Sequence, residues 1–375
     1  MRTLFRNGNI LIEGKFKNHV NLAINKGTID SIYDQSDLSA DYKSEELLDI
    51  FDLEGGYLVP ALLDLQLYGT EGHFFGGDPT VENLAGMEEY LIKQGLGGFL
   101  ATVATNTDEL VLKAIRSAKT FRSSSKGAFL GLHLEGPFLN PLRKGAHPDS
   151  LIRKANLEEV AHWLELAAGE IKMMTVAPEL QDEAVLNLLR KHNVVLSVGH
   201  SNATYQEAND FLAHPITAAT HLFNAMPSLH HRNPGLILSI LEKKPFASII
   251  PDGIHVSYPM IALAKRELSN KLFLITDAVA SSTQGIYQHQ LNKDHFETPD
   301  GILSGSSISL LTGVRNCIQH VDIDPAEAFA MASEIPARVL GIDNSHGMIA
   351  KGRKANLLWL DKNFELKKVW FTFTG

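Results

Sequence analysis

The middle of the chain alternates short apolar runs with segments of helical periodicity. The eight strand-like runs are "GYLVPALLDLQL", "GGFLATVAT", "AFLGLHLEG", "IKMMTVAPE", "VVLSVGHS", "AATHLFNAM", "FASIIPDGIHV" and "LFLITDAVA". Helix-like segments between them include "TVENLAGMEEYLIKQ", "TDELVLKAIRSAKTF", "NLEEVAHWLELAAG", "DEAVLNLLRKHN" and "TYQEANDFLAH". A strand followed by a helix, many times over, favours right-handed βαβ units and a parallel sheet. The pattern predicts an α/β protein with a TIM-type (β/α)8 barrel, and a doubly wound open sheet is the alternative.

Both ends of the chain are rich in β-type residues instead. The N-terminal part holds "LFRNGNILIEGKF", with an Asn-Gly hairpin signal, and "VNLAINKGTIDSIYD", with a similar Lys-Gly pair. The C-terminal stretch "GMIAKGRKANLLWLDKNFELKKVWFTFTG" also lacks a helical period. We therefore predict a small β-sandwich domain built from both termini, residues 1–57 with 345–375, beside a catalytic barrel over 58–344.

Composition narrows the class of protein. The net charge of −9 argues against nucleic acid as the main partner, because phosphate binding usually needs a basic face. No signal peptide and no apolar run of about 18 residues is visible, so we expect a cytoplasmic protein without a membrane partner. The single cysteine, Cys317, excludes an internal disulfide and a cysteine-based zinc site. The 16 histidines are more informative, because histidine ligates metals and titrates near neutrality.

Polar side chains recur where the apolar runs stop. In a barrel these are the C-terminal ends of the strands, where function collects. One strand-end histidine alone is more often structural, but five strands ending alike favour a shared site. The residues concerned are His133, Glu135, His200, His221, Asp252, His255 and Asp277.

These residue types suit a metal-dependent hydrolase. One carboxylate and two imidazoles can hold zinc or a similar divalent ion with an open coordination position, where the pKa of a water falls towards neutrality. Asp277 could take the proton of that water and return it to a leaving group. The alternatives are an N-cap for Asp277 and a turn residue before Pro137 for Glu135.

The first strand carries a polar stripe. In "VPALLDLQLYGTEG", Asp64, Gln66 and Tyr68 alternate with leucines, so they share one face of the strand. That face is either the solvent-exposed face of an edge strand or the inner wall of an active site.

Six further motifs occur in order along the chain: "LHLEGPFLNPLRKGAH", "VGHSNATY", "THLFNAMPSLHHRNPG", "PDGIHV", "ITDA" and "LSGSSISLLTGVRN". With them the chain resembles the N-acetylglucosamine-6-phosphate deacetylase family of the amidohydrolase superfamily over nearly its whole length. The resemblance implies hydrolysis of N-acetylglucosamine 6-phosphate to glucosamine 6-phosphate and acetate.

The resemblance also implies roles for individual residues. Glu135, His200 and His221 match the metal ligands, Asp277 matches the catalytic acid/base, and His147 matches a residue that holds the acetyl carbonyl. The matching or neighbouring substrate-binding positions are Ala146, Asn224, Ala225, Arg232, Asp252, His255, Leu303, Ser304, Gly305 and Ser306. In the family, the arginine at the position of Arg232 reaches into the neighbouring subunit's site, which implies a homodimer.

The first strand departs from the superfamily pattern. Where many members have His-x-His for a second metal, this chain reads Gln66-Leu67-Tyr68, and tyrosine replaces the asparagine of the related branch. Amide and phenol groups are poor ligands at neutral pH. We therefore expect one divalent ion, with zinc first and iron or cobalt as alternatives. Asp64 and Gln66 could hydrogen-bond around its water, and His73 lies nearby in sequence.

Two other functions stay open. Another amidohydrolase, acting on N-acyl amino acids or nucleobases, would not need Arg232 and His255 for a phosphate. A non-catalytic sugar-phosphate binding protein would have no use for Asp277. The segment 281–301 is either a hairpin or a lid.

Overall fold

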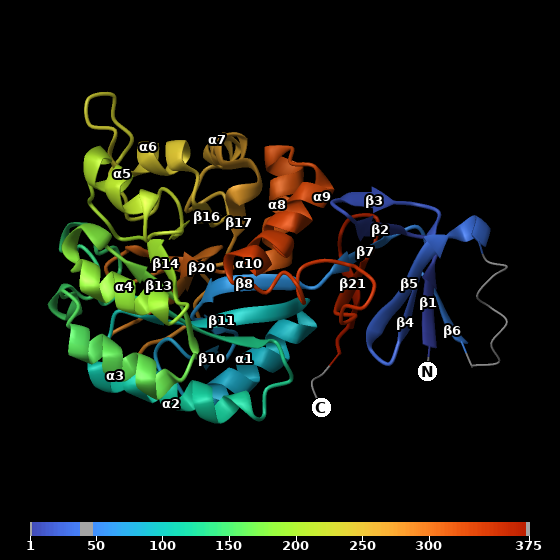
Figure 1. The fold of residues 1–375 in the computed structure, drawn as a ribbon, viewed down its shortest axis with the longest axis horizontal. Coiled ribbons are helices and arrows are strands. Elements are labelled where there is room, and N and C mark those ends of the chain that lie inside the picture. Colours follow the sequence, from blue (N-terminus) through green and yellow to red (C-terminus); the bar gives the residue numbers. More distant parts are fainter. Residues whose placement is uncertain (1, 38–47, 373–375) are drawn as a thin grey trace.

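A parallel barrel forms the larger part of the protein (Figure 1). The computed structural model describes residues 2–37 and 48–372. Its eight barrel strands follow one another in chain order and are all parallel: β8 (Leu62–Leu67), β11 (Leu96–Ala104), β12 (Phe129–Glu135), β13 (Ile171–Val176), β14 (Val195–Val198), β15 (Ala218–Ala219), β16 (Phe246–Ile249) and β17 (Leu272–Leu274). All eight predicted strands are present.

The barrel closes between its first strand and the residues that follow its last. The Asp277 N–H donates to the Gln66 carbonyl at 3.0 Å, and the Tyr68 N–H donates to the Ala278 carbonyl at 2.8 Å. The barrel prediction is therefore confirmed, and the open doubly wound sheet is excluded. Every residue of β8 is buried, so the alternative of an exposed edge strand is wrong.

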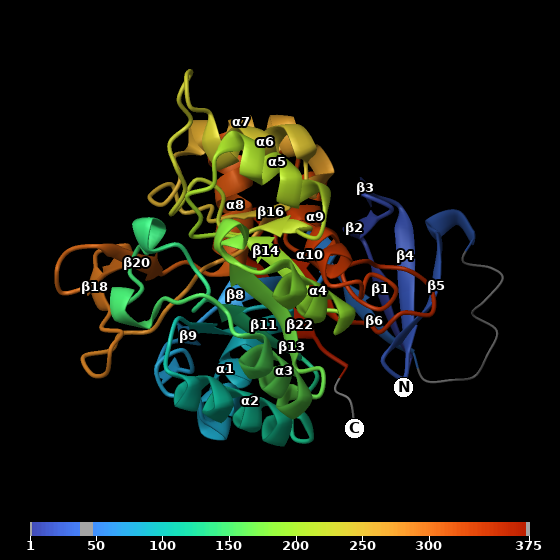
Figure 2. The same ribbon diagram turned by 60° about the vertical axis from the view of Figure 1, so that its left-hand side comes forward.

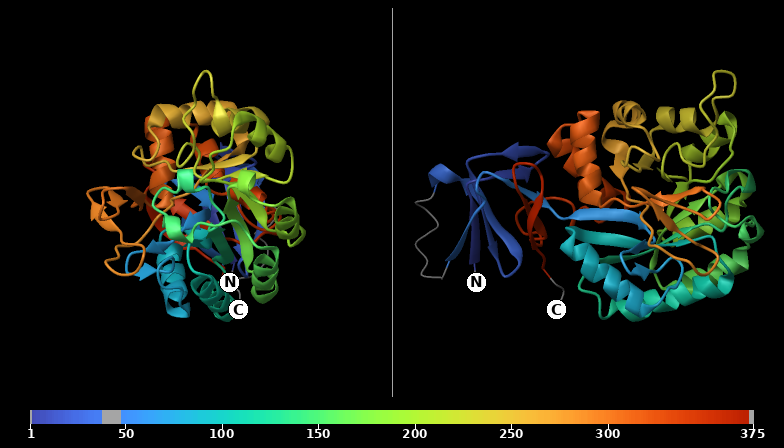
Figure 3. Two further views of the ribbon diagram at one scale, coloured as in Figure 1. Left: turned by 90° about the vertical axis from the view of Figure 1, so that its left-hand side faces the viewer. Right: turned by 180° about the vertical axis from the view of Figure 1, so that it is seen from behind.

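Amphipathic helices cover the outside of the barrel (Figure 3). Side-chain caps begin several of them: Thr80, Thr107, Asn156 and Thr204 each accept a hydrogen bond from the first turn. The five predicted helices are α1 (Val81–Lys93), α2 (Asp108–Arg122), α3 (Leu157–Ala167), α4 (Glu183–Lys191) and α5 (Tyr205–Ala213). They are followed by α6 (Gly235–Lys243), α7 (Tyr258–Leu268), α8 (Leu310–Val321), α9 (Pro325–Met331) and α10 (Glu334–Val339). No helix of the described chain is long and apolar enough to cross a membrane.

Two smaller sheets pack together beside the barrel, at the end where β8 begins (Figures 1 and 3). One has the order β5 (Thr28–Asp34), β4 (Val20–Asn25), β1 (Arg2–Arg6) and β6 (Leu48–Asp52). The other has the order β22 (Leu366–Trp370), β21 (Leu357–Leu360), β7 (Tyr57–Pro60), β2 (Asn9–Ile12) and β3 (Lys15–Lys17). Their shared core includes Phe5, Leu22, Ile29, Leu58 and Leu357.

Strands from both termini therefore share one sheet, as predicted. The division into domains at residues 57/58 and 344/345 stays a prediction. Within it, residues 58–60 belong by pairing to the terminal sheet, because β7 pairs with β2 and β21.

The prediction of a hairpin at Asn7-Gly8 is wrong. β1 and β2, on either side of this pair, belong to different sheets. A Cβ on Gly8 would lie 2.6 Å from the Leu53 Cβ, so glycine is needed here for a close chain crossing. The Lys26-Gly27 pair does join a hairpin, between β4 and β5.

The segment 281–301 is mainly a hairpin. It holds β18 (Gln290–Asn292) and β19 (His295–Glu297), which form a three-stranded sheet with β20 (Leu303–Ser306). This sheet projects beside the barrel (Figure 2). A shorter pair, β9 (Gly69–Thr70) and β10 (His73–Phe74), follows β8.

Candidate active site

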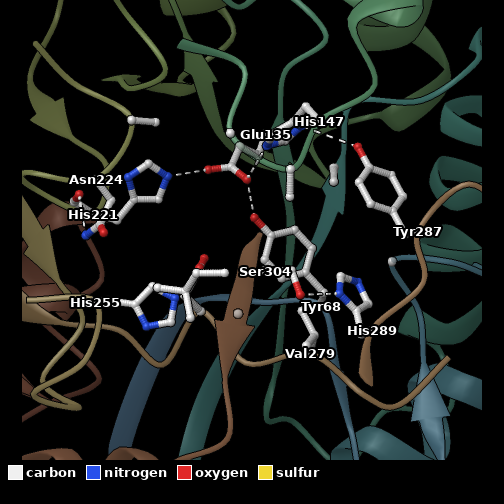
Figure 4. Close-up of a pocket in the computed structure, with 18 of the residues that line it drawn as sticks. Tyr68, Glu135, His147, His221, Asn224, His255, Val279, Tyr287, His289 and Ser304 are labelled. Carbon is white, nitrogen blue, oxygen red and sulfur yellow. Dashed lines mark hydrogen bonds and ion pairs between the residues drawn. The ribbon is translucent and has the colours of Figure 1, made fainter. Parts of the chain in front are cut away.

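A cavity of about 180 Å³ lies at the C-terminal end of the barrel. The terminal sheets pack at the opposite end, so they leave this opening free (Figure 3). Its lining includes most of the predicted site residues: Tyr68, Glu135, Ala146, His147, His200, His221, Asn224, Ala225, His255, Asp277, Leu303, Ser304 and Gly305. Figure 4 shows how several of these side chains converge.

Glu135, His200 and His221 form a buried cluster. Glu135 is the last residue of β12, and the two histidines lie two residues beyond the ends of β14 and β15. The His221 Nε2 lies 2.9 Å from the Glu135 Oε1, and the two histidine Nε2 atoms are 3.1 Å apart. One ligand atom from each residue lies within 4.8 Å of the others.

The protonation pattern of this cluster fits a cation. The His200 Nδ1 lies 2.8 Å from the Arg143 carbonyl oxygen, which can only accept, so Nδ1 carries the hydrogen and Nε2 presents a lone pair. The His221 Nδ1 is buried without a hydrogen-bond partner in the described structure, and its Nε2 faces the Glu135 Oε1 and the His200 Nε2. Both Nε2 atoms and the Glu135 carboxylate can then face a common ion, as in zinc and related sites.

The backbone aims three of these side chains inward. His200, His221 and Asp277 have φ values of 48°, 32° and 54°, in the left-handed region that residues with a Cβ seldom adopt. Each lies just beyond the end of a strand, where the chain turns sharply towards its helix or loop. Such conformations cost roughly 1–3 kcal/mol each and are concentrated at functional sites.

Gln66, on β8, and Tyr68, just after it, are hydrogen-bonded to the acids of the site. The Gln66 Nε2 donates to the Glu135 Oε1 at 2.9 Å and to the Asp277 Oδ1 at 2.8 Å. The Tyr68 hydroxyl makes a short hydrogen bond to the Glu135 Oε2. Burial, followed by the charges of Glu135 and Asp277, raises the pKa of Tyr68 well above its ordinary value, so the phenol is a neutral donor.

Asp64 does not line this cavity. It lines a different cavity, together with Thr276. The Thr276 hydroxyl donates to the Asp64 Oδ2 at 2.6 Å, and burial raises the pKa of Asp64 to about 7. Alternation along the strand places Asp64 on the same face as Gln66, but one pleat deeper in the barrel. His73 lies on β10 against α1, where a Cβ on Gly86 would meet its ring at 2.2 Å.

Asp277 also lines the cavity and is linked to the cluster through Gln66, whose Nε2 donates to both Asp277 and Glu135. Burial, followed by the charges of Glu135 and Asp64, raises the pKa of Asp277 well above its ordinary value. The alternative role of Asp277 as a helix cap is wrong, because the next helix, α8, is capped by Ser309.

His147 is a neutral hydrogen-bond donor towards the cluster. The Thr105 N–H, which can only donate, points at the His147 Nδ1 at 3.3 Å, so the ring hydrogen lies on Nε2. That Nε2 is 3.2 Å from the Glu135 Oε2. Burial, followed by the nearby His200, lowers the pKa of His147 to about 4.

Three predicted substrate-binding residues lie outside the lining. Asp252 lies behind His255, and the Asp252 Oδ2 is 2.5 Å from the His255 Nδ1. Ser306 is fully buried and donates to the Thr276 carbonyl at 2.5 Å. Arg232 is exposed on the loop between β15 and α6, which projects from the barrel (Figure 1).

Several residues of the cavity wall were not predicted from the sequence. They include Phe74, Ala104, Val279, Tyr287 and His289. Tyr287 and His289 alternate in "GIYQHQL", a period-two signal inside the segment whose form was left open. Phe74 and Val279 carry no comparable local signal.

The comparisons with known proteins agree on a family. A model of the amidohydrolase family matches residues 57–374. N-acetylglucosamine-6-phosphate deacetylase from Haemophilus influenzae is 32% identical over 356 residues, covering 92% of this chain and 91% of the relative. N-acetylgalactosamine-6-phosphate deacetylase from Escherichia coli O157:H7 is 31% identical, covering 84% of this chain and 86% of the relative.

A solved structure, N-acetylglucosamine-6-phosphate deacetylase from Pasteurella multocida, superposes with a TM-score of 0.92 at 29% identity. The superposition covers 100% of this chain and 99% of the Pasteurella multocida chain. The chain therefore belongs to the amidohydrolase family, and within it to the group that holds the amino-sugar-phosphate deacetylases.

Proposed function

We propose that the protein hydrolyses the acetamide of N-acetylglucosamine 6-phosphate, releasing glucosamine 6-phosphate and acetate. The observation that carries this proposal is the buried cluster of Glu135, His200 and His221 with Asp277 beside it, in a chain whose relatives of similar length carry this name. N-acetylgalactosamine 6-phosphate is the second candidate, because one relative acts on it by name at nearly the same identity.

Glu135, His200 and His221 would hold one divalent ion, for which zinc is our first choice. When bound, such an ion polarises an amide carbonyl and acidifies a water. Gln66 and Tyr68 support a single ion, because both are already hydrogen-bonded to Glu135. No free ligand pair is then left on β8 for a second one.

The chain's own residues supply the proton transfers. Asp277 accepts a proton from the attacking water and delivers it to the amine nitrogen as the C–N bond breaks. The raised pKa of the isolated carboxyl is suited to carrying that proton. His147, with its hydrogen on Nε2, donates to the carbonyl oxygen as negative charge develops there.

Asn224 and His255 would bind the sugar phosphate at one side of the cavity. Ser304, which is hydrogen-bonded to His289, would be a further substrate contact. Asp252 accepts from His255 and so orients its ring. Arg232 would complete the phosphate site of a neighbouring subunit in a homodimer, because its exposed loop extends away from the cavity of its own chain.

Acetate release tests the function. The purified protein, with its metal content measured, is offered N-acetylglucosamine 6-phosphate, N-acetylgalactosamine 6-phosphate and unphosphorylated N-acetylglucosamine. We expect about one ion per chain and a clear preference for one phosphorylated sugar. Equal rates with and without the phosphate would contradict the phosphate site, and no acetate from any of the three would contradict the proposed function.

Subunit mixing tests the shared site. Arg232→Ala and Asp277→Asn are each expected to reduce activity strongly as pure proteins. A mixed dimer would hold one site with both native residues, so activity should reappear after the two are unfolded and refolded together. Separately refolded proteins mixed afterwards are the control. No recovery from a confirmed mixed dimer would show that Arg232 does not act across subunits.

A further inference from the structure

The cavity has two ends of different character. At one end Tyr68, Ala104, Val279 and Tyr287 are buried, with 6–8% of their surface exposed, and form an apolar cluster with Phe74. At the other end the lining is polar: Asn224 is partly buried, and the buried His255 ring lies against Asp252. In Figure 4, Val279 and Tyr287 lie on one side of Tyr68, and Asn224 and His255 lie on the other.

The wall of the closed end is held by hydrogen bonds. The Tyr287 hydroxyl donates to the Thr105 carbonyl at 2.7 Å and also lies 3.3 Å from the His147 Nδ1. Backbone hydrogen bonds of 3.0 and 2.9 Å join Ser282 and His289, and so close the loop that carries Tyr287. The wall therefore has a defined position relative to the residues that perform the proposed chemistry.

Val279 stands between this cavity and a second one, because it lines both. A Cβ on Gly305 would come within 2.7 Å of the Val279 Cγ1, so β20 packs closely against the valine. Its exposed fraction is 6%. A group that needs more depth must therefore move the Val279 side chain, which β20 restrains on one side.

We propose that this closed end is the acyl pocket of the enzyme, and that Val279 and Ala104 set the length of the N-acyl group it accepts. The inference rests on the proposed function. An amide substrate has a polar sugar phosphate on its nitrogen side and a small apolar group on its carbonyl side. The reacting carbon lies between them, beside Glu135 and Asp277. A phosphate buried among Phe74, Val279 and Tyr287 would lose its hydration without compensation, whereas a methyl group gains from burial there.

The expected selectivity follows from the lining. His147 contacts Tyr287 at this end, so the carbonyl oxygen it would bind lies at the mouth of the pocket. An acetyl methyl group then points at Val279. One methylene more or less in a hydrophobic pocket changes kcat/KM by about 10- to 200-fold. We expect N-acetyl to be preferred and N-butyryl to be poor.

A series of acyl groups tests the pocket. Wild-type protein, Val279→Ala and Ala104→Val are compared on N-formyl-, N-acetyl-, N-propionyl- and N-butyrylglucosamine 6-phosphate. Val279→Ala should raise the butyryl-to-acetyl ratio of kcat/KM by roughly tenfold or more. Ala104→Val should shift the preference towards formyl. Val314→Ala, in the core of α8, is the matched control for loss of buried methyl groups and should leave both ratios unchanged.

The outcomes separate the two proposals. Opposite shifts in the two pocket variants support the acyl pocket. Identical acyl profiles in wild type and both variants, with acetate still released, would overturn it and leave the proposed function standing. If one variant does not fold, the other decides. No hydrolysis by wild type of any member of the series would remove the proposed function and this pocket with it.

Discussion

Asp277→Asn isolates the proton carrier from everything else that Asp277 does. Asparagine keeps the size of the side chain and an oxygen that can accept from the Gln66 Nε2, now at 2.8 Å from the Asp277 Oδ1. It also tolerates the left-handed backbone, with φ of 54° at this position, better than most residues do. What the amide cannot do is take up a proton.

The size of the effect follows from the two proton transfers. General acid–base catalysis contributes about 10²- to 10⁴-fold, and Asp277 would serve in both the attack and the departure of the amine. We expect kcat to fall by about 10³-fold or more, which corresponds to roughly 4 kcal/mol in the activation barrier, with KM little changed. The fold should not suffer, because the substitution removes a buried charge that Glu135 and Asp64 repel.

The assay combines acetate release, metal content and thermal unfolding. Asp64→Asn is the matched control, since Asp64 is another buried carboxyl near β17 but is hydrogen-bonded to Thr276 and lines a different cavity. It should retain kcat within a few-fold. If Asp277→Asn kept its metal and at least a tenth of wild-type kcat, Asp277 would not be the proton carrier.

The remaining predictions concern other parts of the chain. His200→Ala should lose both bound metal and activity, measured by elemental analysis and acetate release; a full metal content would refute its assignment as a ligand. Glu88→Ala should lower the free energy of unfolding by about 3–5 kcal/mol in urea titrations, because this buried carboxylate accepts hydrogen bonds from three backbone N–H groups and a serine hydroxyl before β12; a change below 1 kcal/mol would contradict its role. Burial lowers the pKa of His289 to about 4, against about 6.5 when unfolded, so its contribution to stability is complete above pH 6.5 and is lost as the pH falls towards 4. Urea midpoints of metal-free protein should show this loss, up to about 3 kcal/mol, and His289→Asn should reduce it. The Cys317 thiol is buried, which raises its pKa to about 12, so iodoacetamide at pH 8 should modify it only after unfolding, as mass spectrometry would show.

Much of the site was predictable because parallel strands bring their C-terminal ends together. Glu135, His200, His221 and Asp277 are far apart in the chain, yet each follows an apolar run, and the barrel places such positions around one opening. The pairing of the two β-rich termini was predictable in outline for a similar reason, since half-buried strands need partners. The role of Asn7-Gly8 was not, because a turn signal does not say to which sheet the next strand belongs.

Other parts of the cavity depend on contacts that no local pattern describes. Tyr287 reaches Thr105, and His289 reaches Ser304, only after the hairpin folds back over the barrel. The role that we propose for Arg232 requires a second chain.

The polar stripe on the first strand shows what the sequence determines and what only the tertiary structure determines. The sequence by itself determined that Asp64, Gln66 and Tyr68 share a face, because alternation is a property of neighbouring residues. Only the tertiary structure decided how deep each one lies. Barrel closure pairs Asp64 with Thr276 below the site and brings Gln66 and Tyr68 against Glu135. Depth and partner are set by long-range packing between the first and last strands, which the pattern within one strand does not contain.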